Sequence, residues 1–405
     1  MTLLRLSAGT LGSVFCLTLG TPMLQAQEAA TTTFDPATEV TRGIEILLEM
    51  QEGEGEREWP YEGVYRTNEN GKRRVIPIGY RVGGTSIAST ALLAAPGYDE
   101  DKDRQKAVGR ALEFVLEALE LPLMQPTTRD MYDVRGWGQI YALQFLLTMQ
   151  DHDAVPKKQA KTVSKSIDWL VESLVETALP EKGGWNYAGR RAPSPFMTGP
   201  GLLALFHAKE RGHEVPTEVL ELGLDALERG RAKNGSILYS APPQSISERV
   251  DETLPGAIGR MVSVESTLWL AGRGSQEGLK LALDSFFEHW GELEKRRQQT
   301  GTHVRPYGVA PYYFIYAHHY ASLAISLIED EETQAEYLSQ FHARLQQTRE
   351  EDGGWNDRVF ARSRNYGTAV SILALCMQDT PRPCGYESEA TETESSDETD
   401  GDGGK

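Results

Sequence analysis

The sequence repeats one pattern six times, and residues 345–375 show it most clearly. There a polar-faced segment with helical spacing leads into Gly353-Gly354-Trp355, a loop with three arginines follows, and an apolar helix-forming segment begins near Tyr366. Five looser copies lie upstream at intervals of roughly 57 residues, slightly longer than common helical-pair repeats. The residues that mark the start of each apolar segment are Thr85, Gln139, Thr198, Ser263, Tyr320 and Thr368. This spacing predicts six helix pairs in a single domain.

The two helices of each pair differ in how their apolar residues are distributed. In the first helix these residues recur on one face, as Val163, Ile167 and Leu170 do, so the other face is expected to meet water. In the second helix they run all the way round, as in residues 321–328, which is typical of a helix buried on every side. An open stack of repeats needs polar caps at its ends, whereas a closed ring does not. The predicted fold is therefore all-α, an α/α toroid of six helix pairs with an inner apolar ring and an outer amphipathic ring.

The two ends of the chain differ from the repeats. Residues 1–26 combine an early arginine, an apolar stretch and a plausible cleavage site at Ala26, which predicts a secretory signal peptide and a secreted or periplasmic protein. A retained membrane anchor is the alternative; after cleavage no stable transmembrane segment is expected. Residues 385–405 are acidic, rich in serine and threonine and without apolar periodicity, so we expect a disordered tail after a toroid domain of residues 27–384.

Charge and cysteine content limit the partners. The formal net charge is −18, and the acidic tail accounts for only part of it. Because nucleic acid attracts broad positive surfaces, we do not expect it as a partner. Beyond residue 26 only Cys376 and Cys384 remain, which either form a disulfide or stay as free thiols and cannot supply a multi-cysteine metal site. We expect no metal and no cofactor, and the sequence leaves the oligomeric state open.

The connections between helices alternate in length. After each apolar helix the chain turns quickly, as at residues 211–216, whereas before each apolar helix it runs through a long loop, as at residues 230–255. In a ring of helix pairs this alternation places all the long loops at one end. That end is the expected functional face, because long loops on a rigid scaffold commonly carry binding and catalytic residues.

Aromatic residues and arginines gather in and beside these long loops. The planar, two-pronged donor set of arginine suits a carboxylate, phosphate or sulfate, although any single arginine equally pairs with a local acid or caps a helix. The cluster predicts a mouth that binds a small molecule, a lipid or an anionic glycan. The residues expected to bind the ligand are Arg135, Trp137, Arg191, Arg305, Tyr312, Arg362, Arg364 and Tyr366.

Two segments carry the candidate catalytic residues. Tyr316 and His319 share one stripe of a helix; if the stripe faces the centre of the ring, it lines a cavity with an aromatic ring and an imidazole suited to proton transfer. Asp133 lies among arginines and aromatic residues and is a candidate acid or base. For both segments the alternative is structural: a hydrogen-bonded core histidine, or an aspartate paired with Arg135.

The repeat also resembles that of a known family. Gln347, Gly353 and Trp355 have the Gln-x5-Gly-x-Trp spacing of the QW repeats of squalene and oxidosqualene cyclases. Residues 181–205 look like the same repeat in bacterial prenyltransferase and squalene-cyclase-like proteins. The resemblance covers most of residues 36–378 and implies a terpenoid-cyclase or protein-prenyltransferase toroid around an apolar, aromatic-lined cavity. The Asp-x-Asp-Asp proton donor of squalene-hopene-type cyclases is missing here, and so is the zinc-ligand set of protein prenyltransferases, so the resemblance assigns no reaction.

Three functions stay open at this point. The first is an exported isoprenoid or lipid binder, which as an enzyme would be a cyclase-like isomerase with Asp133 as its acid. The second is a polysaccharide lyase or hydrolase, in which arginine neutralises the carboxylate of an anionic glycan while tyrosine or histidine removes a proton. The third is a non-enzymatic scaffold that presents its loop face to another protein. The sequence does not decide whether the protein is an enzyme.

Overall fold

The computed structural model describes residues 34–63, 67–69, 72–126, 134–187, 192–240 and 253–387. Within these ranges the chain forms twelve α-helices, one ribbon of two strands and three short 3-10 turns. The turns are Tyr98–Glu100, Pro122–Met124 and Ala361–Ser363. Two predicted segments fall wholly or mostly outside the described residues: the signal peptide of residues 1–26, and the acidic tail beyond residue 387.

The six outer helices are amphipathic and bury one face each. They are α1 (Pro36–Met50), α3 (Lys102–Leu119), α5 (Ala160–Thr177), α7 (Thr217–Arg229), α9 (Gln276–Glu294) and α11 (Glu331–Thr348). In α5 the buried positions include Val163, Ile167 and Leu170, as the helical spacing predicts. Side-chain oxygens cap four of the outer helices by accepting a hydrogen bond from backbone N–H groups of the first turn. The capping residues are Asp35, Asp101, Ser275 and Asp330.

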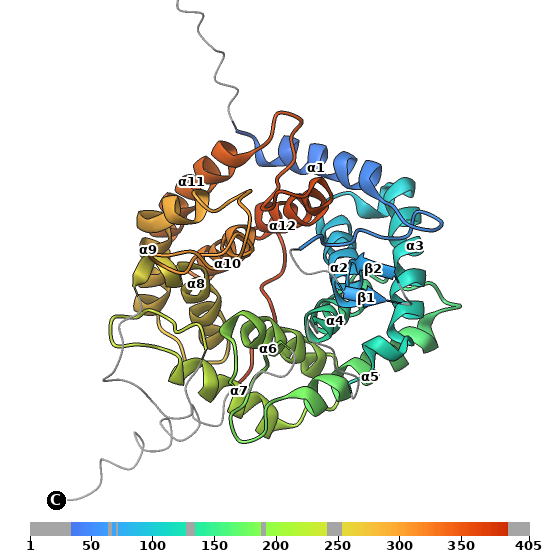
Figure 1. The fold of residues 1–405 in the computed structure, drawn as a ribbon, viewed down its shortest axis with the longest axis horizontal. Coiled ribbons are helices and arrows are strands. Elements are labelled where there is room, and N and C mark those ends of the chain that lie inside the picture. Colours follow the sequence, from blue (N-terminus) through green and yellow to red (C-terminus); the bar gives the residue numbers. More distant parts are fainter. Residues whose placement is uncertain are drawn as a thin grey trace, which may run out of the picture. The chain divides into compact units, whose positions relative to one another are not determined.

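The six inner helices are buried on almost every side and form a closed ring (Figure 1). They are α2 (Ile78–Ala94), α4 (Arg135–Asp151), α6 (Pro195–Glu210), α8 (Leu254–Leu270), α10 (Tyr313–Ser326) and α12 (Arg364–Cys376). Each inner helix contacts the next, and α12 contacts both α2 and α1. The predicted α/α toroid of six helix pairs is therefore confirmed. In the described ranges no helix combines the length and apolarity needed to cross a membrane.

Glycine allows the inner helices α2 and α4 to approach each other closely. A Cβ atom at Gly138 would lie 2.7 Å from the carbonyl oxygen of Gly79, which is too close for any side chain. At Gly83 a Cβ would lie 2.2 Å from the ring of Trp137. The backbone of α2 therefore forms the surface on which the Trp137 ring packs.

The structure contains one element that the all-helical prediction did not include, a short ribbon of two strands. Strands β1 (Thr67–Glu69) and β2 (Lys72–Val75) pair antiparallel in the long loop between α1 and α2, with Thr67 opposite Val75. A long loop must satisfy its backbone N–H and C=O groups, and pairing with itself is one way to do so. The ribbon leaves the helix pairing unchanged.

In three of the six long loops, a tryptophan is hydrogen-bonded both to the preceding outer helix and to the following inner helix. The indole N–H of Trp59, Trp185 and Trp355 donates to a carbonyl near the end of the preceding outer helix, over 2.7, 2.8 and 3.0 Å. The backbone N–H of the same residues donates to Thr85, Thr198 and Thr368 of the following inner helix, over 2.9, 3.1 and 3.2 Å. These threonines are three of the six residues that the sequence alignment of the repeats brought into register.

After α12 the chain continues across the short-turn end of the ring as residues 378–387, named the strap (Figure 1). Gln378 donates from its amide to the carbonyl of Ser322 on α10 over 3.4 Å. At the far end Tyr386 donates its backbone N–H to the carbonyl of Leu270 on α8 over 2.8 Å and stacks on Phe206 of α6, with ring centroids 5.2 Å apart. The strap thus connects the ends of four inner helices.

The structure of the strap moves the predicted start of the tail and shows whether Cys376 and Cys384 are paired. Gly385 and Tyr386, which the sequence assigned to a disordered tail, are ordered parts of the strap, and Tyr386 is buried. The residues around them are polar, but the contacts of Tyr386 with Phe206 and Leu270 keep this segment against the inner helices. Cys376 and Cys384 are free thiols in this structure, so the disulfide alternative is not realised.

Candidate ligand-binding site at the ring centre and long-loop face

Aromatic side chains from five inner helices and one loop meet at the centre of the ring and form a cluster that we name the aromatic belt. Tyr141 on α4 lies close enough to Tyr320 on α10 that, after burial, it contributes to raising the pKa of Tyr320. Since α4 and α10 are three steps apart in a ring of six, this contact spans the centre. The members of the belt are Tyr61, Tyr80, Trp137, Tyr141, Phe196, Tyr316, Tyr320 and Tyr366.

The belt is a packed assembly of rings. Phe196 and Tyr316 have centroids 4.4 Å apart, and Tyr61 and Tyr366 lie 4.6 Å apart. Trp137 and Tyr366 are each 4% exposed and Tyr316 is 2% exposed, whereas Tyr141 is partly exposed. Three sequence candidates, Trp137, Tyr316 and Tyr366, are therefore brought together, in a closely packed centre where the sequence led us to expect an open cavity.

The hydroxyl groups of the belt are used within the protein. Tyr316 donates to Ser263 Oγ over 2.7 Å. Burial raises the pKa of Tyr61, Tyr316, Tyr320 and Tyr366 well above the usual value, so these phenols are neutral at physiological pH. Because Tyr316 and Tyr61 direct their hydroxyl groups to Ser263 and Asp357, what their rings offer to a ligand is aromatic surface.

Asp357 is the acidic group next to the belt. Its side chain is 1% exposed, and the hydroxyl of Tyr61 donates to Oδ2 over a long 3.4 Å. Oδ1 has no hydrogen-bond partner among the described residues. Burial raises the pKa of Asp357 from 3.8 to about 7, against the opposing effect of the neighbouring Arg358. This carboxyl therefore keeps its proton at far higher pH than an ordinary aspartate does, as proton donors in active sites commonly do.

Sequence analysis missed Asp357 and named Asp133, which lies outside the described residues. One signal was present in the repeats. Gly184-Trp185-Asn186 is followed by Tyr187, whereas the matching Trp355-Asn356 is followed by an aspartate. A carboxylate at a position that is aromatic in another copy of the repeat indicates a role specific to that copy.

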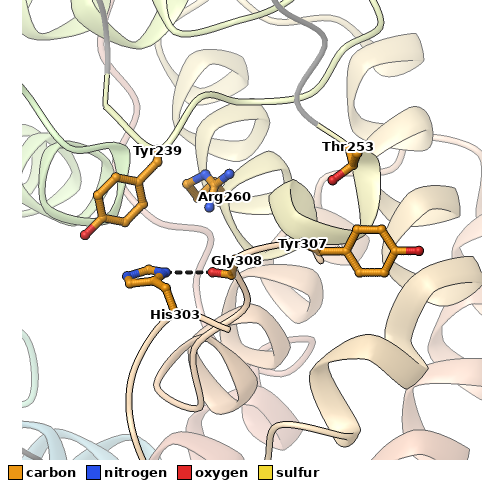
Figure 2. Close-up of a pocket in the computed structure, with 6 residues that line it drawn as sticks. All are labelled: Tyr239, Thr253, Arg260, His303, Tyr307 and Gly308. Carbon is orange, nitrogen blue, oxygen red and sulfur yellow. Dashed lines mark hydrogen bonds between the residues drawn. The ribbon is translucent and has the colours of Figure 1, made fainter. Parts of the chain in front are cut away.

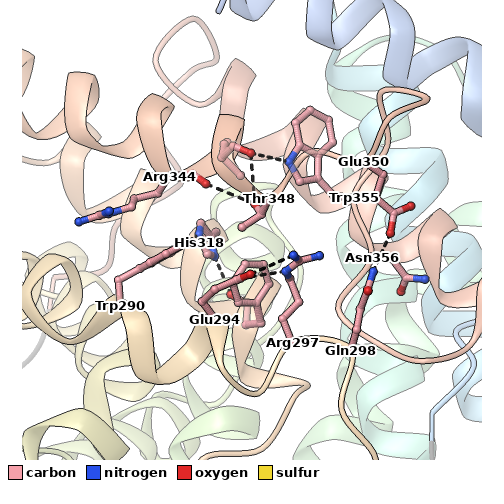
Figure 3. A network of polar contacts seen from close by, with 12 residues as sticks. Trp290, Glu294, Arg297, Gln298, His318, Arg344, Thr348, Glu350, Trp355 and Asn356 are labelled. Carbon is pink, nitrogen blue, oxygen red and sulfur yellow. Dashed lines mark hydrogen bonds and ion pairs between the residues drawn. The ribbon is translucent and has the colours of Figure 1, made fainter. Parts of the chain in front are cut away.

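The two histidines of α10 have different roles. His318 is fully buried; its Nδ1–H donates to the carbonyl of Phe314 over 2.7 Å, and its Nε2 accepts from the indole of Trp290 over 2.9 Å (Figure 3). His318 is therefore a hydrogen-bonded core histidine, the structural alternative that the sequence analysis set against a role in proton transfer. His319 is partly exposed and meets the edge of Tyr320 at 5.0 Å, and burial lowers its pKa to about 4. The imidazole of His319 is therefore neutral at physiological pH.

Most of the arginines expected to bind ligand have protein partners. Arg362 pairs with Glu52 and Glu62 over 2.7 and 3.1 Å. Arg364 pairs with Glu350 over 3.4 Å and also with Asp352. The charges of Arg362 and Arg364 are therefore paired within the protein, which is the alternative to ligand binding that the sequence analysis left open.

Of the other three predicted arginines, Arg135 and Arg305 lie among the described residues. Arg135 is buried at the start of α4 and donates to the carbonyl of Gln125. Arg305 is exposed in the loop before α10, and Arg191 lies outside the described residues.

A cavity of about 310 Å³ opens beside the N-terminal ends of α8 and α10 (Figure 2). It is lined by Tyr239, Thr253, Arg260, His303, Tyr307 and Gly308. The Nδ1–H of His303 donates to the carbonyl of Gly308 over 2.6 Å, which leaves Nε2 to accept from the hydroxyl of Tyr312 over 3.1 Å. Of the sequence candidates among the described residues, Tyr312 adjoins this cavity through its hydrogen bond to His303. His303 was missed, because a single loop histidine has no distinguishing pattern.

A series of ring contacts connects the cavity with the aromatic belt. His303 lies 5.8 Å from Tyr312 between ring centroids, and Tyr312 lies 5.1 Å from Phe196, a member of the belt. Tyr312 and Phe196 therefore link the cavity at the long-loop face with the belt at the ring centre. Across the described ranges, histidine, cysteine, aspartate and glutamate do not gather in any group of three that could hold a metal ion.

Comparison with known proteins supports the fold. No protein-family model and no curated protein matches the sequence. Among solved structures, a type II terpene cyclase from Scytonema, bound to its substrate geranylgeranyl dihydroxybenzoate, is similar at a TM-score of 0.52 and 12% identity, over 85% of this chain and 97% of that one.

Glycan-degrading enzymes are equally similar. An unsaturated glucuronyl hydrolase from Streptococcus agalactiae has a TM-score of 0.55 at 12% identity, over 85% of this chain and 94% of that one. A glucoamylase from Hormoconis resinae has a TM-score of 0.53 at 10% identity, over 88% of this chain and 76% of that one. At such identities a likeness shows the fold alone, and the chain is an α/α toroid of the kind found in both a terpene cyclase and glycan hydrolases.

Proposed function

We propose that the protein binds an isoprenoid or lipid-like ligand against the aromatic belt and acts on it by acid catalysis through Asp357. The observation that carries the proposal is the placement of a buried, incompletely hydrogen-bonded carboxyl in contact with Tyr61, one of the eight aromatic residues of the belt. Polyene chemistry needs both parts: a proton donor to start the reaction, and aromatic rings to stabilise positive charge on carbon.

The proposed reaction is an isomerisation. The proton of Asp357 forms a C–H bond at one end of a carbon-carbon double bond, and the other end becomes a cation. A second double bond of the ligand supplies the electron pair for a new C–C bond, and loss of a proton from a carbon next to the final cation balances the first step. No oxidant or reductant is required. The similar terpene cyclase was solved with a geranylgeranyl compound as substrate, which agrees with this ligand class.

The test is product analysis with a panel of linear isoprenoids. We expect the purified protein to convert at least one into a cyclic isomer of unchanged mass, detected by gas chromatography and mass spectrometry. Asp357→Asn is expected to lower the rate by about 100-fold or more, because general acid catalysis typically contributes about 100- to 10,000-fold. Asp352→Asn is the matched control, because Asp352 lies in the same loop but is exposed. Equal rates in Asp357→Asn and wild type would remove Asp357 from the mechanism.

A second candidate function is favoured by the cavity at the long-loop face. There the buried guanidinium of Arg260 and the hydrogen-bonded pair of His303 and Tyr312 combine a positive charge with a proton-accepting group. This combination suits an anionic glycan, and one similar structure is an unsaturated glucuronyl hydrolase. If acidic oligosaccharides are cleaved with a new ultraviolet absorbance, and His303→Ala abolishes it, the lyase interpretation replaces the isoprenoid one.

We also propose that the protein is exported after cleavage near Ala26, on the basis of the predicted signal peptide. Intact-mass analysis of the protein from its own host gives the mature N-terminus directly. A mass that includes residues 1–26 would favour the retained membrane anchor. The same preparation, made without detergent, also reveals any lipid or oligosaccharide that co-purifies.

A further inference from the structure

Arg358 follows Asp357 in the loop before α12 and is one of the most deeply buried charged residues of the structure. Its side chain is 2% exposed. Two of its donors, Nε and Nη2, have no hydrogen-bond partner among the described residues. A buried charge without a partner is strongly destabilising, so native proteins rarely keep one unless another group or a ligand pairs with it.

The two unpartnered donors form one edge of the guanidinium group. The N–H bonds at Nε and Nη2 point in nearly the same direction, which lets one carboxylate or phosphate accept both hydrogen bonds. Three other arginines of this protein use that edge in this way. Arg81 binds Glu58 with both bonds at 2.7 Å, and Arg231 binds Glu265 at 2.9 and 2.8 Å. Arg297 binds Glu294 at 2.8 and 2.9 Å.

The surroundings of Arg358 are positively charged. Arg296 lies near enough that the charge of Arg358, after burial, contributes to lowering the pKa of Arg296. The adjacent acid, Asp357, is largely uncharged below neutral pH, because burial raises its pKa to about 7. An anion at this edge would therefore be attracted by the charges of both Arg358 and Arg296, and the neighbouring carboxyl would repel it less than an ionised aspartate does.

The position of this edge relates it to the aromatic belt. Asp357, the neighbour of Arg358 in the chain, accepts the hydrogen bond from Tyr61 and is close enough to Tyr366 to raise the pKa of that phenol. Tyr61 and Tyr366 are both members of the belt. A ligand that lies against these two rings therefore has the Arg358 loop at its end.

We propose that Arg358 binds an oxyanion of the ligand, a carboxylate or a phosphate, through Nε and Nη2, while the apolar body of the same ligand lies against the aromatic belt. The substrate class thereby narrows from isoprenoids in general to isoprenoids that carry an acidic group. This inference rests on the proposed function for the apolar body of the ligand.

The experiment compares three ligands with the same isoprenoid chain and different ends: a carboxylic acid, a monophosphate and the neutral alcohol. Binding is measured by isothermal titration calorimetry at neutral pH. For the wild type we expect the acid, the phosphate or both to bind at least about tenfold more tightly than the alcohol, since charged hydrogen bonds are roughly twice as strong as neutral ones. The better of the two identifies the oxyanion.

Two variants of Arg358 test whether binding needs the two-pronged hydrogen bonding of the guanidinium or only its positive charge. Arg358→Gln is expected to reduce the affinity for the anionic ligands to that of the alcohol, and Arg358→Lys to restore only part of it, because lysine lacks the two-pronged edge. Arg362→Gln is the matched control, since Arg362 lies in the same loop and already pairs with Glu52 and Glu62. This variant is expected to keep the wild-type preference. Circular dichroism checks the fold, and if Arg358→Gln does not fold, Arg358→Lys decides.

The outcomes distinguish this inference from the proposed function. Equal binding of all three ligands by the wild type would overturn the oxyanion subsite and leave the isoprenoid proposal standing. Unchanged preference in a folded Arg358→Lys or Arg358→Gln would also overturn it. If none of the three binds, the proposed function itself fails, because the aromatic belt then takes no isoprenoid chain.

Discussion

At the scale of single residues, burial separates candidates for chemistry from ordinary ion pairs. Asp352 and Asp357 lie five positions apart in one loop, but Asp352 is exposed and pairs with Arg364, whereas Asp357 is enclosed and only weakly hydrogen-bonded. The same contrast separates Arg362, which holds two glutamates, from Arg358, which holds none among the described residues. Residue type is equal within each pair, so the difference comes from the surroundings.

The raised pKa of Asp357 predicts a pH-dependent stability. The group ionises near 3.8 in the unfolded chain and near 7 in the folded protein, so the stability it contributes is complete below about pH 3.8 and is lost as the pH rises through 7. Asparagine cannot ionise. The unfolding free energy of Asp357→Asn, minus that of the wild type, should therefore rise between about pH 4 and pH 8, by up to ~4 kcal/mol.

Urea unfolding at a series of pH values measures this difference. Other groups, such as His318, whose pKa burial lowers to about 4, titrate in both proteins and cancel in the comparison. A difference that does not change with pH would show that Asp357 ionises in the folded protein as it does in water.

At the scale of elements, the tryptophan and threonine pairs determine where each long loop leaves the outer layer and joins the inner one. Trp355 connects the carbonyl of Leu345 on α11 with Thr368 on α12, so the loop that carries Asp357 and Arg358 is held at its base. Because the loop is anchored, the two functional candidates are positioned by the scaffold. Loss of the anchor is expected to affect stability first.

Replacing Thr368 with valine is the cleanest test of this anchor. The change keeps the shape but removes the oxygen that accepts from the backbone N–H of Trp355, so a buried donor is left unpaired at a cost of about 1–3 kcal/mol. Thr90→Val is the control, since Thr90 only bonds back to Ser86 of its own helix. Chemical denaturation that shows no larger loss for Thr368→Val than for Thr90→Val would contradict the role assigned to the pair.

At the scale of the whole toroid, closure depends on contacts between the first and last repeats. Helix α12 packs against both α1 and α2, and the strap returns from α12 to the ends of α8 and α6. A repeat array that is closed in this way protects its terminal repeats from solvent, which an open array has to do with polar caps. The strap adds a second connection between opposite sides of the ring.

Truncation distinguishes the strap from the tail. A chain that ends at Glu387 keeps Tyr386 with its contacts to Phe206 and Leu270, so it should unfold at the temperature of the full chain. A chain that ends at Met377 loses these contacts and should be destabilised by about 3 kcal/mol or more, the scale of removing a large buried aromatic ring. Tyr386→Ala in the full chain should reproduce most of the loss. Equal melting temperatures for both truncations would mean that the strap is not part of the stable toroid.

The sequence by itself determined the helix pairs and the ring, because apolar periodicity and repeat spacing are properties of nearby residues that decide which face of each helix is buried. It also brought Thr85, Thr198 and Thr368 into register as equivalent positions of their repeats, and the structure then showed that these three residues anchor the loops. These features require only local order and repetition.

Only the tertiary structure decided which side chains are candidates for the site. Arg362 and Glu62 are 300 positions apart in the chain, and no local pattern predicts that they pair. The proton held by Asp357 and the open edge of Arg358 depend on burial by residues from distant repeats, such as Tyr61. Ionisation and pairing are set by the neighbours that folding brings together, whereas helix formation is set by neighbours along the chain, and for this reason the fold was readable in the sequence and the site was not.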